Sequence, residues 1–284
     1  MNINGKRKHI SCPDFIRYAD DFVVLHEDLN IVQRCQQIIS EWLKGVSLEL
    51  KPSKTRLTHT LHKYEENVGF NFLGHTIRQF KVGNYRADKD NQKRPLGFIT
   101  IIKPSKEKIL LHLEEIGRII DTHKCAPQAV LISRLNPVIK GWANYYSTAV
   151  SKSAFNKLDY LTYQKLRAWG LRRSTNKKRR KVAMKYWHTI KYDNWCFSQD
   201  GMKLALHRDT PIERHIKVKG ESSPYDGEWS YWCARMGKHP EITSRMAKLL
   251  KTQKGRCTHC GLFFKGDDLI EIDHITSKAN GGKE

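Results

Sequence analysis

The chain has 284 residues, and its 51 Lys and Arg against 29 Asp and Glu give a formal net charge of +22 at pH 7. So strong a positive field concentrates polyanions, which predicts a nucleic-acid partner and binding that weakens as salt rises. We see neither an apolar run long enough to cross a bilayer nor a secretory leader, so we expect no membrane partner and a cytoplasmic location, or an organellar one in a eukaryote. The seven Cys residues, scattered apart from one C-x-x-C pair, favour a reducing compartment over a disulfide framework.

The first predicted element is a hairpin whose turn carries two neighbouring carboxylates. Ile16 and residues 22–25 have the β-branched and aromatic character of buried strands, and Asp20 and Asp21 lie between them. Adjacent Asp side chains repel each other unless a cation lies between them, and two-metal phosphoryl transfer uses such carboxylates to hold Mg²⁺. An ordinary Asp–Asp turn is the alternative interpretation, but the two flanking apolar strands favour a catalytic corner.

The hairpin is followed by a predicted helix and further strands. Residues 28–44 predict an amphipathic helix, because apolar side chains recur there at spacings of three and four. Strand character returns at residues 47–50 and again at 68–77, where glycines interrupt it. The polar residues 81–95 predict a linker or a hairpin loop.

The second half of the chain predicts helices in its first part and irregular structure after them. A short strand over 96–102 precedes a helix that Ser105 can cap. Further helices are predicted over residues 127–150, 153–172 and 241–253. The segment 186–240 is rich in Trp and Tyr and predicts an irregular module with short strands.

Five motifs follow one another along this sequence. They are Tyr-Ala-Asp-Asp at residues 18–21, the stretch 48–55 ending in Lys54 and Thr55, the Phe-Leu-Gly stretch at 70–77, the stretch 135–146, and residues 257–261 taken with 271–275. In this order they resemble group II intron reverse transcriptase/maturases that carry a C-terminal HNH endonuclease domain. The first three resemble boxes of the polymerase palm, the fourth the core of the maturase-specific thumb, and the last the start of the nuclease.

The resemblance implies an α+β fold in four parts. These are the C-terminal half of the reverse-transcriptase palm (residues 1–80), a three-helix maturase thumb (81–185), an irregular DNA-binding segment (186–245) and an incomplete HNH ββα-metal domain (246–284). Residues 224–227, together with Tyr231 and Trp232, resemble the segment that binds target DNA in the family.

The resemblance also assigns catalytic and metal-binding residues. Asp20 and Asp21 would hold Mg²⁺, and Lys54 would lie near the nucleotide or the primer terminus. In the nuclease, Asp273 would be a metal ligand and His274 the general base on water. Half of a structural Zn²⁺ site would come from Cys257 and Cys260, with the rest from His259, Cys233 or another chain. A buried Cys pair without zinc is the alternative.

Basic residues of the thumb predict contact with RNA. Guanidinium and ammonium groups suit phosphate oxygens, and we assign this contact to Lys140, Arg167, Arg172, Arg173 and the run Lys177, Lys178, Arg179, Arg180 and Lys181. A solvated face is the alternative for that run, but so dense a block repels itself unless a polyanion screens it. Trp142 and Tyr146 lie four residues apart, and we assign them mainly to the helical core.

The resemblance further implies sequence on both sides of this chain. In the family, the fingers and the third metal-binding Asp precede the position of Asp20, and further nuclease ligands follow that of Gly282. We therefore expect this chain alone to be a binding module with half-sites and an exposed apolar palm face. The complete protein would bind intron RNA, copy it into DNA and cut target DNA. The alternatives are an inactive gene fragment and a non-catalytic RNA-binding splicing helper, which could work with a separate fingers–palm polypeptide.

Overall fold

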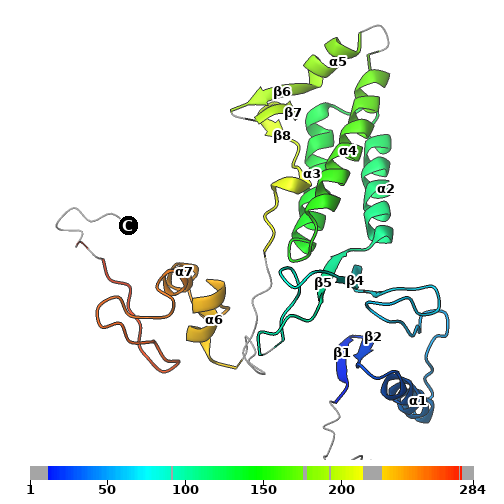
Figure 1. Ribbon diagram of the computed structural model, residues 1–284. Coiled ribbons are helices and arrows are strands. Elements are labelled where there is room, and N and C mark those ends of the chain that lie inside the picture. Colours follow the sequence, from blue (N-terminus) through cyan, green and yellow to red (C-terminus); the bar gives the residue numbers. More distant parts are fainter. Residues whose placement is uncertain are drawn as a thin grey trace, which may run out of the picture. The chain divides into compact units, whose positions relative to one another are not determined.

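A computed structural model describes residues 12–90, 92–174, 178–191, 193–213, 226–274 and 276. The chain forms two compact units, Met1–Glu213 and Arg214–Glu284 (Figure 1). Helices and small antiparallel sheets are mixed, which confirms the α+β class. Among the described residues, no helix has both the length and the apolar character that a bilayer crossing needs.

The elements have the following bounds. The strands are β1 (Asp14–Tyr18), β2 (Asp21–Leu25), β3 (Phe70–Phe72), β4 (His75–Lys81), β5 (Phe98–Pro104), β6 (Trp187–Ile190), β7 (Asp193–Gln199) and β8 (Met202–Lys203). The helices are α1 (Leu29–Gly45), α2 (Lys106–Thr122), α3 (Gln128–Tyr145), α4 (Lys152–Arg172), α5 (Arg179–Tyr186), the 3-10 turn η1 (His207–Asp209), α6 (Trp229–Met236) and α7 (Ser244–Thr252).

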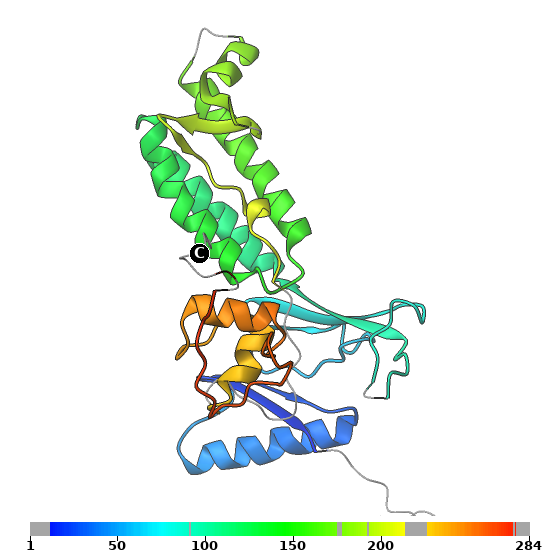
Figure 2. The same cartoon turned by 90° about the vertical axis from the view of Figure 1, so that its left-hand side faces the viewer.

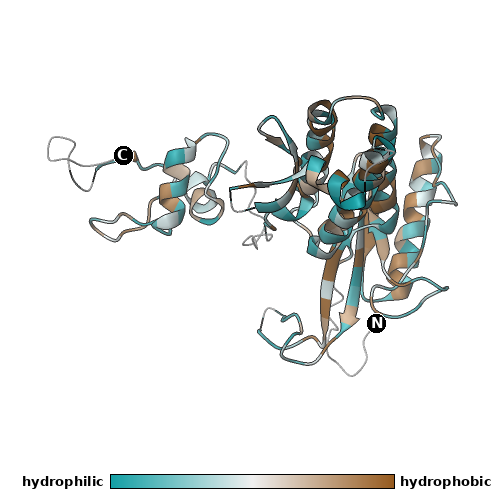
Figure 3. Ribbon diagram, turned by 90° about the horizontal axis from the view of Figure 1, so that it is seen from above, coloured by the Kyte–Doolittle hydropathy of each residue, from teal (hydrophilic) through white to brown (hydrophobic). Residues whose placement is uncertain are grey.

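The first hairpin and the helix after it form as predicted. β1 and β2 pair antiparallel along their whole lengths, and the Asp28 side chain caps α1 by accepting from Asn30 N. Hydrophobic and hydrophilic residues alternate in bands along α1 (Figure 3). None of its residues is buried, and Trp42 is 67% exposed. Exposed apolar side chains on both elements agree with the expected exposure of apolar surface here, and its assignment to a palm face stays a prediction.

The predicted strand at residues 47–50 does not form. Residues 46–47 make a turn after α1, and residues 48–50 have no regular structure. Leu48 is 60% exposed, and none of the described strands pairs with this stretch. A strand is stabilised by its hydrogen-bonded neighbour, so β-forming residues without a partner do not make one.

The second sheet has the order β3-β4-β5. Phe72 pairs with His75, which leaves Leu73 and Gly74 as a two-residue turn. Both turn residues have positive φ, 47° and 76°, as a type I′ hairpin requires. The predicted break at Gly74 is thus a turn, and β4 then pairs with β5 from His75↔Pro104 to Lys81↔Phe98.

The three helices α2, α3 and α4 lie side by side (Figure 2). They occupy the residues predicted to be the thumb, and we keep that name for this bundle. Ser105 caps α2 by accepting from Lys108 N, as predicted. The main core contains residues of all three helices, among them the fully buried Ile116, Leu131 and Leu166. α3 ends at Tyr145 rather than at 150, because the chain turns there and returns to the sheet through a bond from Val150 N to Ile102 O (2.8 Å).

The small sheet β6-β7-β8 belongs to the thumb rather than to a separate segment that begins at residue 186. Trp187, Phe197 and Leu204 are buried in the same core as the thumb helices. Asn136 ties this sheet to α3 by accepting from Ala205 N (2.7 Å) and donating to Lys203 O (3.0 Å). Shared burial of large aromatic rings therefore moves the boundary from residue 186 to residues 213–214.

The second unit is small and has its own core. α6 and α7 pack through Cys233, Ala247 and Leu250, and α6 ends at Gly237, whose φ is 70°. After α7 a loop closes through the bridge Arg256↔Phe263. Described residues of this unit form isolated bridges and no longer strand, so the predicted ββα-metal start is not seen in them.

Two tyrosine hydroxyls attach the second sheet to the thumb. Tyr145 Oη donates to Leu73 O (2.9 Å), and Tyr146 Oη donates to Gly74 O (3.2 Å). Gly74 O also accepts from Ser105 N (2.9 Å). Burial raises the pKa of Tyr146 to about 12, so its hydroxyl keeps the proton that it donates. The turn thus sets how the sheet meets α2 and α3.

Replacing Gly74 should destabilise this junction. A Cβ at Gly74 would lie 2.8 Å from Tyr146 Oη, on a backbone whose φ of +76° suits glycine. Left-handed strain and the loss of the hydrogen bond together predict that Gly74→Ala lowers stability by about 2 kcal/mol and the melting temperature by roughly 4–8 °C. Gly83→Ala is the matched control, because no atom lies within 4 Å of its added Cβ. Equal melting temperatures for the two variants would contradict this role of Gly74 in the junction.

A row of buried, hydrogen-bonded side chains crosses the thumb next to this junction. His112 Nε2 lies 2.8 Å from His207 Nε2, and His207 Nδ1 lies 2.7 Å from Asp159 Oδ1. Asp159 also accepts from the backbone N–H groups of His207 and Arg208. His112 stacks on Trp142 at 4.7 Å. Burial, and then the neighbouring His207, lower the pKa of His112 from 6.5 to about 3.

Acid should therefore destabilise the thumb through His112. With a folded pKa of about 3 and an ordinary value of 6.5, the unfolded chain binds the extra proton between these pH values. Stability is unaffected above pH 6.5 and falls below it, by about 2 kcal/mol at pH 5. Thermal unfolding from pH 7.5 to pH 5 should show a shallower decline for His112→Gln than for the wild type. Parallel declines would contradict the prediction.

Candidate active-site corner and nucleic-acid interface

Asp20 and Asp21 lie at the corner between β1 and β2, where the sequence predicted them. Tyr18 pairs with Asp21, so Ala19 and Asp20 form the turn, and Arg17 Nε donates to Ala19 O (2.8 Å). Ala19 has a φ of 52°, in the left-handed region that residues other than glycine rarely adopt. Both carboxylates are exposed. The corner therefore presents them to solvent on a tightly constrained turn.

The corner suits Mg²⁺ in the kind of its ligands but not in their number. Carboxylate oxygens are the ligands that Mg²⁺ prefers, and the ion commonly takes one or two carboxylates and keeps several waters. In the part of the chain that the structure describes, no three His, Cys, Asp or Glu side chains gather to share an ion. Asp20 and Asp21 could thus supply two ligands, and a two-metal site needs more.

A cavity of about 670 Å³ connects the corner to the thumb. Its lining combines the carboxylate of Asp21, the cation of Lys108, the turn 73–74 and the aromatic rings of the thumb. Our sequence reasoning missed the polar α2 residues of this cavity, Lys108 and His112. Their spacing of four residues on one predicted helix was the available signal.

Lys54 lies outside regular structure. It closes a turn through a bond from its backbone N to Lys51 O (3.0 Å), and Thr55 Oγ1 donates to the same carbonyl (3.0 Å). The side chain of Lys54 is exposed. Its role beside a nucleotide or primer stays a prediction.

The basic residues of the thumb fall into two groups. Lys140 and Arg167 are exposed, and among the described residues neither forms an ion pair. Arg172 Nη1, by contrast, lies 3.8 Å from Asp121 Oδ1. Arg173 donates to Lys124 O (2.7 Å) and Ala126 O (3.0 Å). Arg173 thus holds the α2–α3 connection in addition to any contact with RNA.

The basic run occupies the start of α5. Lys178 precedes the helix, and its first turn contains Arg179, Arg180 and Lys181 without an acidic residue. All four side chains are exposed, and Lys177 lies outside the described residues. Cations at the positive end of a helix dipole raise the electrostatic energy of the free protein. Phosphate groups near this end would relieve it.

The second unit contains the C-x-x-C stretch that the sequence predicted as half of a zinc site. Cys257 N donates to Leu262 O (2.9 Å), and Gly261 N donates to Cys257 O (2.9 Å), which folds the C-x-x-C stretch into a tight turn. Hydrogen bonds from the backbone of Cys260 and then of His259 lower the pKa of Cys257, which favours the thiolate that binds metal. Cys233 is fully buried among apolar side chains of α6 and α7, and no group of three possible metal ligands in the described part of the chain brings it together with Cys257 and Cys260.

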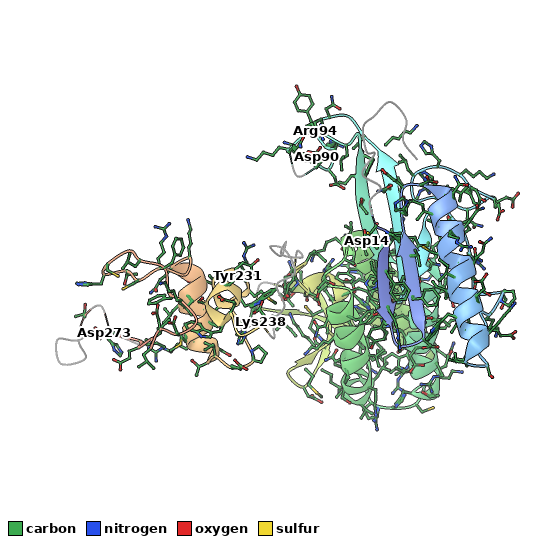
Figure 4. All side chains as sticks on the ribbon, turned by 90° about the horizontal axis from the view of Figure 1, so that it is seen from below. Asp14, Asp90, Arg94, Tyr231, Lys238 and Asp273 are labelled. Carbon is green, nitrogen blue, oxygen red and sulfur yellow. The ribbon has the colours of Figure 1, made fainter. Side chains whose placement is uncertain are left out.

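Asp273 and His274 are neighbours on an irregular stretch (Figure 4). Asp273 is exposed, and its Oδ1 accepts from His274 N (2.7 Å). No described group of three ligands includes either residue. Of the expected target-DNA motif, residues 224–225 lie outside the described residues, while Trp232 Nε1 donates to Asp226 Oδ1 (3.3 Å). Their nuclease and DNA-binding roles stay predictions.

Comparison with known families separates the first unit into two stretches. Residues 7–77 match the family described as reverse transcriptase (RNA-dependent DNA polymerase). Residues 110–187 match the group II intron, maturase-specific domain. The first stretch contains the Asp20–Asp21 corner and the turn 73–74, and the second contains most of α2 and all of α3 and α4.

A relative from Schizosaccharomyces pombe (strain 972) is described as an uncharacterized 91 kDa protein in cob intron. It is 27% identical to this chain over 150 residues, which cover 50% of this chain and 18% of the relative. This chain thus spans only a small part of that protein's length. The chain combines a stretch similar to reverse transcriptases with a group II intron maturase-specific domain.

Proposed function

We propose that this chain is the C-terminal part of a group II intron reverse transcriptase/maturase and that it binds intron RNA to assist splicing. The order of the two family matches carries the proposal. A reverse-transcriptase stretch comes first, and a maturase-specific domain follows that coincides with the three-helix thumb. The formal net charge of +22 supports a polyanionic partner.

RNA binding is assigned to the exposed cations of the thumb. Lys140 and Arg167 are exposed, and so are the four cations at the start of α5. Contacts from such side chains reach phosphate oxygens and fix the position of the protein without reading sequence. The specific intron RNA would then be recognised through its shape.

In the complete protein, Asp20 and Asp21 would hold Mg²⁺ for RNA-directed DNA synthesis, with Lys54 near the nucleotide or primer. A bound ion would activate a 3′ hydroxyl and neutralise the leaving pyrophosphate. Asp273 and His274 would begin an HNH site for target DNA, and Cys257 with Cys260 would supply half of a structural Zn²⁺ site. The exposed turn at the corner supports the assignment of Asp20 and Asp21, and the lowered pKa of Cys257 supports that of Cys257.

A non-catalytic splicing helper is the second candidate. It is favoured by the absence of a third metal ligand near the corner among the described residues. A separate fingers–palm polypeptide could still complete the site, because Phe15 and Trp42 leave an apolar face uncovered, at 57% and 67% exposure. An inactive gene fragment is the remaining alternative, and the absence of both RNA binding and nucleotide addition in the tests below would indicate it.

Neutralising the start of α5 should weaken RNA binding. We expect replacement of Lys178, Arg179, Arg180 and Lys181 by Gln to reduce affinity for an intron RNA in an electrophoretic shift. Because each phosphate that a cation neutralises contributes about 0.7–0.9 to the slope of log K against log salt, the slope should fall by roughly 3.

The matched control neutralises four exposed cations outside the thumb, namely Arg34, Lys44, Arg56 and Lys63. This variant carries the same net charge, so a difference between the two variants reports position rather than total charge. An unchanged affinity and salt slope for the α5 variant would refute the assignment.

Primer extension separates the catalytic from the non-catalytic candidate. On poly(rA)/oligo(dT) with Mg²⁺, we expect this chain alone to add no nucleotides, since the described residues offer only Asp20 and Asp21 at the corner. Incorporation that disappears in Asp20→Ala would show a complete polymerase site and eliminate the helper. Incorporation that persists in Asp20→Ala would show that the corner is not the active site.

A further inference from the structure

The β4–β5 hairpin ends in a long connection, residues 82–97. This connection is ordered by its own backbone bonds, from Val82 N to Gly97 O (3.0 Å), Asp88 N to Phe98 O (2.8 Å) and Leu96 N to Asp88 O (2.8 Å). Figure 4 shows Asp90 and Arg94 near its outer end, away from the thumb helices. We call residues 81–97 the hairpin tip; Asn91 is its one residue outside the described set.

Both carboxylates of the tip accept hydrogen bonds from the β4–β5 hairpin itself. Asp90 Oδ1 accepts from the backbone N–H groups of Gln92 and Arg94, both at 2.9 Å, and its Oδ2 accepts from Arg94 Nε (2.7 Å). Hydrogen bonds from the Arg94 backbone and side chain lower the pKa of Asp90, so the carboxylate stays ionised. Asp88 Oδ2 accepts from Thr100 N (2.8 Å). The acidic groups thus shape the loop.

The remaining charges of the tip are positive and point to solvent. Lys81, Arg86, Lys89 and Lys93 are exposed, and among the described residues none of them forms an ion pair. Tyr85 lies among them and is 105% exposed, and in the described part of the chain its ring contacts no other aromatic ring. An ordered loop therefore holds an exposed aromatic ring and four exposed cations that form no ion pair among the described residues.

We propose that the hairpin tip binds single-stranded RNA, with Tyr85 stacked on an unpaired base and the cations around it on the adjacent phosphates. Aromatic rings interleaved with cations are how proteins hold unpaired strands, because every base has a π-face and every linkage a charge. An ordered backbone also lowers the entropy lost on binding. The proposal adds a second RNA contact, outside the thumb, to the proposed function on which it rests.

The test removes the ring and leaves the charges. In the background of the neutralised α5 run, which prevents thumb contacts from masking the tip, affinity is measured for an oligo(A) strand and for an RNA duplex of equal length. We expect Tyr85→Ser to weaken binding of the single strand roughly 5- to 150-fold, the factor that stacking one base supplies. Binding of the duplex and the salt slope should not change, and Tyr85→Phe should bind the single strand as tightly as the parent, which has the neutralised α5 run and an intact Tyr85.

Two matched variants complete the test. Tyr160→Ser removes an exposed ring of α4, 60% exposed, and should leave binding unchanged. Replacing Lys89 and Lys93 by Gln should lower the salt slope by about 0.7 for each phosphate that these cations neutralise. Because Tyr85 is fully exposed, its variants should melt at the temperature of the parent that carries the neutralised α5 run.

The outcomes separate this proposal from the proposed function. If Tyr85→Ser binds the single strand as tightly as its parent while the α5 variant binds more weakly than the wild type, the tip proposal fails and RNA binding by the thumb stands. If only Tyr85→Ser weakens binding, the tip stands and the thumb assignment fails. Equal losses of affinity for single strand and duplex would overturn stacking at the tip.

Discussion

The junction between the second sheet and the thumb depends on the two carbonyl groups of the turn 73–74. Hydroxyls of Tyr145 and Tyr146 donate to these carbonyls, and Ser105 N adds a third bond at the start of α2. The turn lies near the end of the stretch that matches reverse transcriptases, and both tyrosines lie in the stretch that matches the maturase-specific domain. One set of hydrogen bonds therefore connects the two regions and forms part of the cavity beside Asp21.

In the first unit, acidic and basic side chains differ in how they are used. Several carboxylates accept hydrogen bonds within the protein, as Asp88 and Asp90 do in the hairpin tip and Asp159 does beneath η1. Many lysines and arginines, in contrast, remain exposed. Because 51 Lys and Arg outnumber 29 Asp and Glu, the net field at the surface is positive and would attract a polyanion.

The candidate metal sites share one property, which is that each has too few ligands among the described residues. Asp20 and Asp21 are two carboxylates on one turn, and Cys257 and Cys260 are two thiols on another. Cys233, which the sequence offered as a third zinc ligand, is buried in an apolar core. Turns bring sequence neighbours together, but the remaining ligands of such sites come from other parts of a fold.

The sequence by itself determined the local elements and the order of motifs. The Asp–Asp hairpin, the cap at Ser105 and the helices of the thumb follow from periodicity and capping, which act within a few residues. Only the tertiary structure decided that residues 47–50 form no strand, that residues 187–204 join the thumb core, and that His112 meets His207. These outcomes depend on partners distant in sequence, and a local pattern carries no information about which partner is present.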